Sequence, residues 1–268
     1  MKNTKLVALD LDGTLLNNKL VISDNSIRTL LDVKEKNVEL AVISGRALES
    51  IKRAVKDLPI TYFAPLNGAL IYNNKTQKTE KTYSINNKTA IKTTKILTDN
   101  NIYFLAITVN KTYKADFEPI LEENITYFNS LNLSLINQIN MEKEKILSFQ
   151  LFIENENQKK DIKNLYRSLE TFNDISIVES GNNYYQINPV TANKGFALRY
   201  IADKMKIDLK HCMAFGDSES DISMLKEAGF GIAMKNASLK VLEKVNVITF
   251  HDNDNDGVSE FIKRFIIG

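Results

Sequence analysis

Two aspartates follow an apolar run near the start of the chain. Residues 6–9 read LVAL, which predicts a buried strand, and Asp10, Leu11 and Asp12 follow directly. Aspartates at a buried strand end repel each other and cost free energy to desolvate. A generic D-x-D is more often a turn or a helix cap, but the same pair could serve nucleophilic, acid–base or cation-binding chemistry.

Further polar segments follow other predicted strands or open predicted helices. They are Gly13 and Thr14; Ser44, Gly45 and Arg46; Lys194; and Gly216, Asp217, Ser220 and Asp221. Each has an ordinary alternative, such as a helix cap for Ser44, a solvated side chain for Lys194 or a favourable helix-start charge for Asp221. Ligands of open parallel sheets bind beyond the carboxyl ends of the strands. These polar segments together therefore predict a site at one edge of the sheet.

The elements that must position these residues alternate at both ends of the chain. Continuous apolar strands are expected over residues 5–9, 38–43, 60–64, 211–215, 230–233 and 245–250. Amphipathic helices are expected over residues 23–36, 46–57, 195–206, 221–228, 238–244 and 258–266. This alternation predicts an α/β fold with a parallel sheet and helices on both of its faces.

The middle of the chain has a different pattern. Strands that look half exposed are expected over residues 102–109, 146–153, 175–179 and 184–187, and helices over residues 88–98, 117–131 and 157–172. We therefore expect an α+β unit over residues 83–186, inserted into a Rossmann-like core formed by residues 1–82 and 187–268.

Composition excludes several classes of function. The 35 Lys and Arg residues against 33 Asp and Glu give a net charge of +2, which makes no electrostatic case for nucleic acid or membrane binding. No apolar run approaches the roughly 18–20 residues of a membrane span. The single cysteine, Cys212, excludes an internal disulfide and suits a reducing compartment. We expect a soluble cytoplasmic protein; its oligomeric state is not readable from the sequence.

The combined pattern resembles the haloacid dehalogenase (HAD) superfamily of phosphohydrolases. The motif D-x-D-G-T matches residues 10–14, the strand ending in Ser or Thr matches Ser44, the helix-start lysine matches Lys194, and G-D-x-x-x-D matches residues 216–221. More narrowly the chain is similar to the Cof-type branch, with a type IIB cap between the second and third motifs. Segments with the sequences LNGA, NP, AMKNA and DGV support this narrower resemblance.

The resemblance implies a role for each motif. Asp10 is expected to attack phosphorus and form an aspartyl-phosphate, and Asp12 to act as general acid and base. Mg²⁺ is the expected cofactor, with ligands from Asp10, the main-chain carbonyl of Asp12, Asp217 and Asp221. Lys194 is expected to offset negative charge. The expected phosphate-binding residues are Gly13, Thr14, Ser44, Gly45, Arg46 and Ser220.

The expected function is that of a Mg²⁺-dependent phosphatase for small phosphorylated metabolites such as sugar phosphates, pyridoxal phosphate or flavin mononucleotide, with the cap choosing the leaving group. A sugar phosphomutase and a non-catalytic phospho-ligand sensor remain alternatives. Ser220 stands where the Cof-type motif has asparagine, which puts an outer contact to phosphate or to Asp10 in doubt. The loop over residues 251–257 resembles the start of an EF-hand, but the required glutamate is replaced by Lys263.

Overall fold

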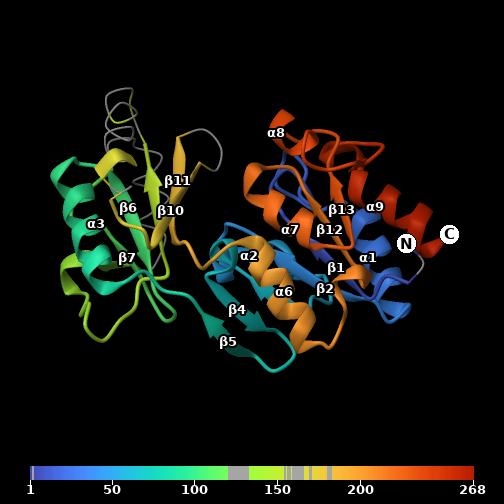
Figure 1. Cartoon of the computed structure of the whole chain (residues 1–268), viewed down its shortest axis with the longest axis horizontal. Helices are drawn as coiled ribbons and strands as arrows, with labels where there is room; N and C mark the ends of the chain where they lie inside the picture. The colour runs from blue at the N-terminus through green and yellow to red at the C-terminus, as the bar shows by residue number, and fades with distance from the viewer. Residues whose placement is uncertain are drawn as a thin grey trace. The chain divides into compact units, whose positions relative to one another are not determined.

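The computed structural model describes residues 1, 3–119, 133–153, 155, 158, 166–168, 171–179 and 183–268. The chain contacts divide it into two compact units (Figure 1). We call Met1–Lys81 together with Ala192–Gly268 the core unit, and Thr82–Thr191 the inserted unit. No helix among the described residues is long and apolar enough to cross a membrane.

The core unit is organised by one sheet, in the strand order β14-β13-β12-β1-β2-β3-β4-β5. Its strands are β1 (Leu6–Leu9), β2 (Glu39–Ile43), β3 (Tyr62–Ala64), β4 (Leu70–Asn73), β5 (Lys78–Thr82), β12 (Cys212–Gly216), β13 (Phe230–Ala233) and β14 (Val247–Ile248). Every pair from β14 to β3 is parallel, and β4 pairs antiparallel with β3. The predicted α/β class with a parallel sheet is confirmed.

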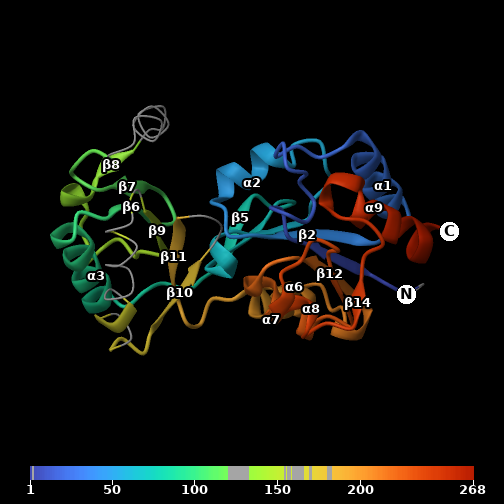
Figure 2. The same cartoon turned by 90° about the horizontal axis from the view of Figure 1, so that it is seen from above.

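Helices cover both faces of this sheet, as Figure 2 shows: α1, α2 and α9 lie on one side, and α6, α7 and α8 on the other. They are α1 (Asp24–Glu35), α2 (Leu48–Ala54), α6 (Lys194–Lys204), α7 (Ile222–Glu227), α8 (Leu239–Leu242) and α9 (Gly257–Ile262), with a π-helical turn over Lys263–Ile267. Ser23 caps α1 by accepting from the Ser26 N–H, as its residue type predicts.

Strand alternation explains why the central strands are apolar throughout. Leu6 and Ala8 of β1 belong to the buried cluster that includes Leu198 and Ile201 of α6. The intervening residues of these strands point to the other face of the sheet. There Phe215 of β12 packs edge-on against Phe261 of α9, with ring centroids 5.7 Å apart. A parallel strand buried on both faces needs an unbroken apolar run, which is the signal that identified β1 and β2 in the sequence.

Two strands of the core sheet, β4 and β5, were not predicted from the sequence. The β5 sequence KTEKT is mostly exposed, so it lacks the apolar signal by which the other strands were recognised. The helix expected over residues 46–57 is shorter in the structure, where α2 begins at Leu48 and ends at Ala54. Ala47 provides no side-chain cap for that helix.

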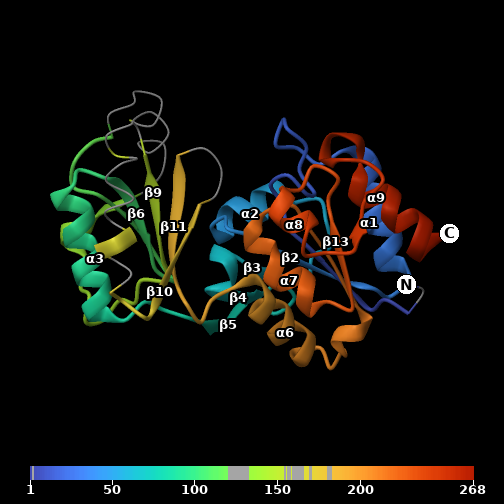
Figure 3. The ribbon, with the colours of Figure 1, turned by 45° about the horizontal axis from the view of Figure 1, so that its top comes forward.

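The inserted unit contains a second sheet in the order β10-β11-β9-β6-β7-β8, with helix α3 (Asn87–Asp99) beside it (Figure 3). Its strands are β6 (Tyr103–Ile107), β7 (Thr112–Lys114), β8 (Ser134–Leu135), β9 (Ser148–Phe152), β10 (Ile175–Glu179) and β11 (Tyr184–Pro189). The short strands β7 and β8 were not predicted. The helices expected over residues 117–131 and 157–172 lie mostly outside the described residues.

The expectation that the strands of this sheet are half exposed is wrong for two of them. All five residues of β6 are buried, and so are four of the five in β9. These strands lie in the middle of the sheet, where each is flanked by a neighbour on both edges, and β9 carries polar side chains that nevertheless lose contact with solvent.

A charge cluster at the start of β2 carries a stability prediction. The Glu39 carboxylate accepts hydrogen bonds from Lys34 Nζ and Thr61 Oγ1, and Lys75 Nζ lies 3.0 Å from Glu39 Oε1. Burial alone would raise the pKa of Glu39, but these donors outweigh it and lower the pKa from 4.5 to about 2.

Because the pKa of Glu39 is lower in the folded state, its contribution to stability is present above pH 4.5 and is lost as the pH falls toward 2. We expect Glu39→Gln to reduce the free energy of unfolding by about 1 kcal/mol near neutral pH. Urea denaturation of both proteins at several pH values should show the difference shrinking in acid. A difference that grows in acid would contradict the assignment.

Candidate active site

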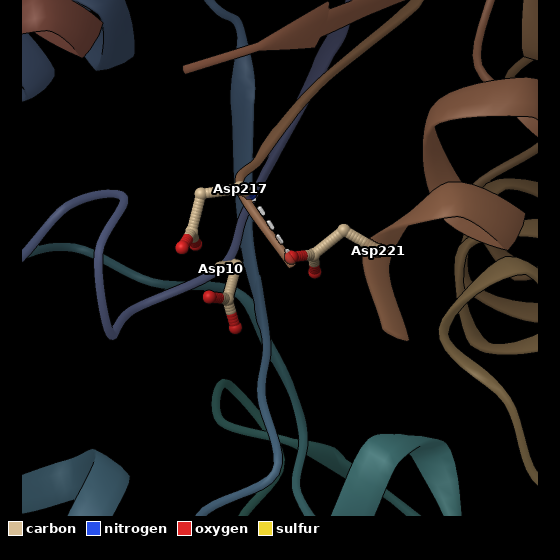
Figure 4. Close-up of side chains that lie close together, drawn as sticks. All are labelled: Asp10, Asp217 and Asp221. Carbon is tan, nitrogen blue, oxygen red and sulfur yellow. Dashed lines mark hydrogen bonds between the residues drawn. The ribbon is translucent and has the colours of Figure 1, made fainter. Parts of the chain in front are cut away.

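The loops that follow β1 and β12 bring acidic side chains together. Because these strands are parallel neighbours, their carboxyl ends lie at the same edge of the sheet, and the Asp10 N–H donates to the Phe215 carbonyl at 3.2 Å. Figure 4 shows Asp10 and Asp217 just beyond the two strands and Asp221 beside them. One carboxylate oxygen from each of the three lies within 4.8 Å of the others, so the group could hold a metal ion.

Lys194 bridges two of these carboxylates. It is the first residue of α6, whose start is fixed by the Asn193 side chain accepting from the Phe196 N–H. Lys194 Nζ donates to Asp10 Oδ1 at 2.7 Å and to Asp221 Oδ1 at 2.6 Å, and only 2% of the residue is exposed. A buried ammonium needs such partners. Lys194 is therefore not a solvated surface side chain, which was the alternative interpretation of the sequence.

The turn that precedes α7 donates hydrogen bonds to the other carboxylate oxygen of Asp221. Its Oδ2 atom accepts from the Asp217 N–H at 3.1 Å, the Ser218 N–H at 2.9 Å and the Ser218 hydroxyl at 2.9 Å. Gly216 permits this close approach, because a Cβ there would lie 2.4 Å from the Asp221 Cβ. Ser220 places its hydroxyl 2.8 Å from that of Ser218. The turn therefore fixes Asp221 relative to Asp217.

The loop after Asp10 packs directly against Asp217. Thr14 Oγ1 donates to Asp217 Oδ1 at 2.9 Å. Gly13 has a φ of +75°, and a Cβ at that position would lie 2.4 Å from Asp217 Oδ2. Both the backbone conformation and the space therefore require glycine. Asn236 supports the same loop by donating from its amide nitrogen to the Gly13 carbonyl at 2.8 Å.

The electrostatics of the cluster favour additional positive charge. Burial raises the pKa of Asp10 well above its ordinary value, and Asp221 raises it further, against the opposing effect of Lys194. Burial and Asp221 likewise raise the pKa of Asp217 to about 6. Burial would lower the pKa of Lys194, but Asp10 and Asp221 outweigh it and raise that pKa. Three carboxylates share one ammonium, so a cation is the chemical complement of this site.

Asp12 does not place its carboxylate in this cluster. Its side chain is 51% exposed and forms a bidentate ion pair with Arg46, with 2.7 Å from Nε to Oδ2 and 2.5 Å from Nη2 to Oδ1. Arg46 was expected to bind phosphate, and no sequence pattern indicated that it pairs with Asp12. The expectation for Asp12 as a metal ligand concerned its main-chain carbonyl and stays a prediction.

The loop after β2 is held by the segment that precedes β4. Ser44 is buried, and its hydroxyl accepts from the Arg46 N–H at 3.3 Å. The Asn67 N–H donates to the Ser44 carbonyl at 2.9 Å, and the Leu66 N–H donates to the Arg46 carbonyl at 3.0 Å. Gly45 lies between them in the same loop. The LNGA segment, residues 66–69, had no expected role beyond the family resemblance. It thus supports the loop that carries Ser44.

The structure therefore groups most of the residues that sequence motifs singled out. It brings together Asp10, Thr14, Lys194, Asp217 and Asp221, and separately joins Asp12 to Arg46. Sequence reasoning missed the supporting roles of Ser218 and Asn236. The signal for Asn236 was present in the AMKNA segment, but a sequence does not show which carbonyl an exposed amide will reach.

Removal of the buried ammonium should destabilise the core unit. We expect Lys194→Met to lower the free energy of unfolding by about 3 kcal/mol, because Asp10 and Asp221 would lose their buried counter-charge. Denaturation in urea measures this, with the exposed Lys210→Met as the matched control. Magnesium ions should recover part of the loss if they supply positive charge to the same carboxylates. Equal stability of the variant and the control would contradict the bridging role.

A parallel α/β core with a carboxylate cluster at the strand ends and an inserted α+β unit defines a class of hydrolytic enzymes. The chain belongs to the haloacid dehalogenase-like hydrolase family, whose model matches residues 7–262. It is 29% identical over 275 residues to the 5-amino-6-(5-phospho-D-ribitylamino)uracil phosphatase YcsE of Bacillus subtilis, covering 98% of this chain and 96% of that protein.

Further comparisons agree with this assignment. The phosphatase YwpJ of Bacillus subtilis is 28% identical over 98% of this chain and 100% of its own length. A solved haloacid dehalogenase-like hydrolase from Bacteroides thetaiotaomicron has a TM-score of 0.85 at 22% identity, covering 98% and 100% of the two chains. A HAD subclass IIB sugar phosphatase has a TM-score of 0.80 at 20% identity, covering 98% of this chain and 99% of that chain.

These findings confirm the resemblance to Cof-type HAD proteins, the fold with its cap and the enzyme class. The protein is a HAD-type phosphatase. The two structural matches are below 25% identity and bear on the fold alone.

Proposed function

We propose that the chain is a Mg²⁺-dependent phosphatase that hydrolyses small phosphomonoesters through an aspartyl-phosphate on Asp10. The observation that carries this proposal is the buried cluster of Asp10, Asp217 and Asp221 with Lys194 bound to two of the three. An anionic nucleophile can attack an anionic phosphoryl group only where positive charge is concentrated around both.

Asp10 is the residue that we propose as the nucleophile. Lys194 holds its Oδ1 atom, which leaves Oδ2 to form the bond to phosphorus as the bond to the ester oxygen breaks. In the second step water attacks the same phosphorus, the bond to Asp10 breaks and inorganic phosphate leaves. Splitting the hydrolysis in this way replaces one difficult displacement with two easier ones.

Asp12 is the residue that we propose for proton transfer. It would protonate the departing ester oxygen in the first step and take a proton from the attacking water in the second. Its ion pair with Arg46 must open before either transfer, because both carboxylate oxygens are engaged by that guanidinium. Arg46, once released, would be available with Ser44 and Gly45 for phosphoryl oxygens, together with Gly13, Thr14 and Ser220.

Mg²⁺ fits the donor set, because carboxylate oxygens are its preferred protein ligands and the cluster lacks positive charge. Asp10, Asp217, Asp221 and the Asp12 carbonyl would hold it, and when bound it would neutralise charge on the transferring phosphoryl group. We propose that residues 83–186 are the cap that contacts the leaving group. Relatives include an enzyme named for a phosphorylated ribitylaminouracil, which supports a small phosphorylated metabolite as the substrate.

Phosphate release from a panel of sugar phosphates, pyridoxal phosphate and flavin mononucleotide, with Mg²⁺ or with EDTA, tests the proposal. Turnover that depends on Mg²⁺ would support it, and the rank order of esters would narrow the substrate class. Movement of phosphate between sugar positions without release would instead indicate a mutase. Binding of esters without turnover would indicate a sensor, and either result would overturn the proposed hydrolysis.

A further inference from the structure

The carboxylates of the cluster come from loops that are distant in the sequence. Asp10 belongs to the loop after β1 and Asp217 to the loop after β12, and Figure 4 shows the two side chains next to each other. Asp10 is only 4% exposed, and like charges repel each other more strongly where water is excluded. Contacts that hold the two loops together therefore help to keep these carboxylates close enough to share a cation.

A short segment after β13, residues 234–238, is attached to the end of β12 and to the loop of Asp217. The Met234 N–H donates to the Gly216 carbonyl at 2.9 Å, and the Ser238 N–H donates to the Asp217 carbonyl at 3.0 Å. We call residues 234–238 the strap. Because both hydrogen bonds join backbone groups, they fix the strap relative to the loop of Asp217 without any contribution from side chains.

Asn236, the asparagine of the AMKNA segment, connects the strap to the turn after β1. Its side-chain nitrogen donates to the Gly13 carbonyl at 2.8 Å, and its Oδ1 atom accepts from the Asn253 N–H at 3.1 Å. The Gly13 backbone packs directly on Asp217, since a Cβ at Gly13 would lie 2.4 Å from Asp217 Oδ2. A displacement of Gly13 would therefore remove the surface against which the Asp217 carboxylate rests.

Asn253 holds the other end of the same turn. It is 8% exposed, and its side-chain nitrogen donates to the Leu16 carbonyl at 3.0 Å and to Asn18 Oδ1 at 3.3 Å. The turn is closed on itself by the Leu16 N–H, which donates to the Leu11 carbonyl at 2.9 Å. The carbonyls of Gly13 and Leu16 thus both accept from asparagine side chains in the C-terminal part of the core unit.

The loop over residues 251–257, which resembles the start of an EF-hand, fixes the position of Asn253. Its three aspartates all accept hydrogen bonds from protein donors: from Asn255 to Asp252, from Asn18 to Asp254, and from Ser23, Asn25 and Ser26 to Asp256. The acidic side chains of this loop therefore anchor it to the core unit, and Asn253 lies in the middle of the anchored segment.

We propose that Asn236 and Asn253 are positioning residues for the Mg²⁺ site, because they hold the turn after β1 against the loop of Asp217. The inference rests on the proposed function, in which the Asp12 carbonyl is one of the metal ligands. That carbonyl directly precedes Gly13, so the orientation of the turn also determines where it points. A turn without these hydrogen bonds is free to adopt other orientations, and metal binding must then restrict it at a cost in free energy.

The test measures Mg²⁺ binding to the metal-free full chain by isothermal titration calorimetry, with no ester present. Asn236→Ala and Asn253→Ala each remove one donor to the turn. The matched control is Asn74→Ala, because the Asn74 side-chain nitrogen also donates to a backbone carbonyl, that of Ile60, at 2.9 Å. Ile60 precedes β3, so the control lies at the end of the strands opposite to the carboxylate cluster. All titrations are made well below the lowest Tm, at which every variant is folded.

We expect the dissociation constant for Mg²⁺ to rise about tenfold in Asn236→Ala and in Asn253→Ala, because residues that orient metal ligands typically contribute at least this much to affinity. Asn74→Ala should bind Mg²⁺ as the wild type does, although it also loses a hydrogen bond to a carbonyl. Asn236 is exposed, so its variant should fold and tests the inference alone. Wild-type affinity in Asn236→Ala, or an equal loss of affinity in Asn74→Ala, would overturn the inference.

Turnover gives a second readout, which a general loss of stability would not change in the same way. At limiting Mg²⁺ the rate of Asn236→Ala should be about tenfold below that of the wild type, and saturating Mg²⁺ should restore it with KM for the ester unchanged. A deficit that saturating Mg²⁺ does not restore would contradict the positioning role.

The two measurements separate failure of this inference from failure of the proposed function. Weaker Mg²⁺ binding by Asn236→Ala, in a chain that hydrolyses no ester, would reject the phosphatase proposal and keep the positioning role. Hydrolysis of esters by the wild type, with Mg²⁺ affinity unchanged in both asparagine variants, would keep the phosphatase and reject the positioning role.

Discussion

Asp10→Asn should abolish phosphate release from every ester, with a loss of more than about a thousandfold in kcat. The amide oxygen of asparagine can still accept the hydrogen bond that Lys194 donates, so the geometry of the site is retained. What is lost is the anionic oxygen that forms the bond to phosphorus. Asp221 cannot substitute, because it is bound by Lys194 through one oxygen and by three donors through the other.

The thermal stability of Asp10→Asn should not fall with its activity. Burial raises the pKa of Asp10, which means that the folded protein is penalised for holding this carboxylate in its charged form. The neutral amide removes that penalty, so Tm of Asp10→Asn should equal or exceed that of the wild type near neutral pH. Thermal unfolding without added metal measures this.

Asp32→Asn, an exposed position on α1, is the matched control for the activity measurement. Its turnover should equal that of the wild type. Trapping with acid after mixing enzyme and ester should recover phosphate bound to the wild-type protein and none on Asp10→Asn. Turnover that survives in Asp10→Asn would reject the nucleophile, whatever the other residues do.

The residues of the carboxylate cluster were predictable because the fold and the chemistry constrain the same positions. The apolar run of β1 and the pair of aspartates after it are adjacent in the sequence, and parallel pairing of β1 with β12 then brings Asp217 to the same edge. Gly13 is fixed for a related reason, since its positive φ and its contact with Asp217 exclude any side chain. Local sequence and global topology agree at these positions.

Other features depend on contacts between residues distant in sequence, and patterns could not predict them. Strand β5 joins the core sheet although its side chains are polar and mostly exposed, since an edge strand needs backbone pairing more than apolar side chains. The pairing of Asp12 with Arg46 spans 34 positions. The burial of Gln150 and Gln186, which pair with each other across β9 and β11, depends on strand register, which the sequence does not show.

Asp12 is the residue for which the structure changes the prediction most. Its carboxylate is bound by Arg46 and half exposed, outside the buried cluster. If Asp12 supplies the proton to the departing oxygen, its importance must depend on how badly the leaving group needs that proton. Alkoxides of sugars are strong bases and depart poorly without protonation, whereas p-nitrophenolate is stable as an anion.

Asp12→Asn should therefore lower the rate at which a sugar phosphate forms the aspartyl-phosphate by about 10²–10⁴-fold, and the rate at which p-nitrophenyl phosphate forms it much less. The acid-trapping measurement distinguishes the two steps: with p-nitrophenyl phosphate, Asp12→Asn should accumulate protein-bound phosphate, because water is no longer deprotonated in the second step. Asp57→Asn, in the exposed loop after α2, is the control and should show neither effect. An equal loss on both esters without accumulation would assign Asp12 to holding Arg46 rather than to proton transfer.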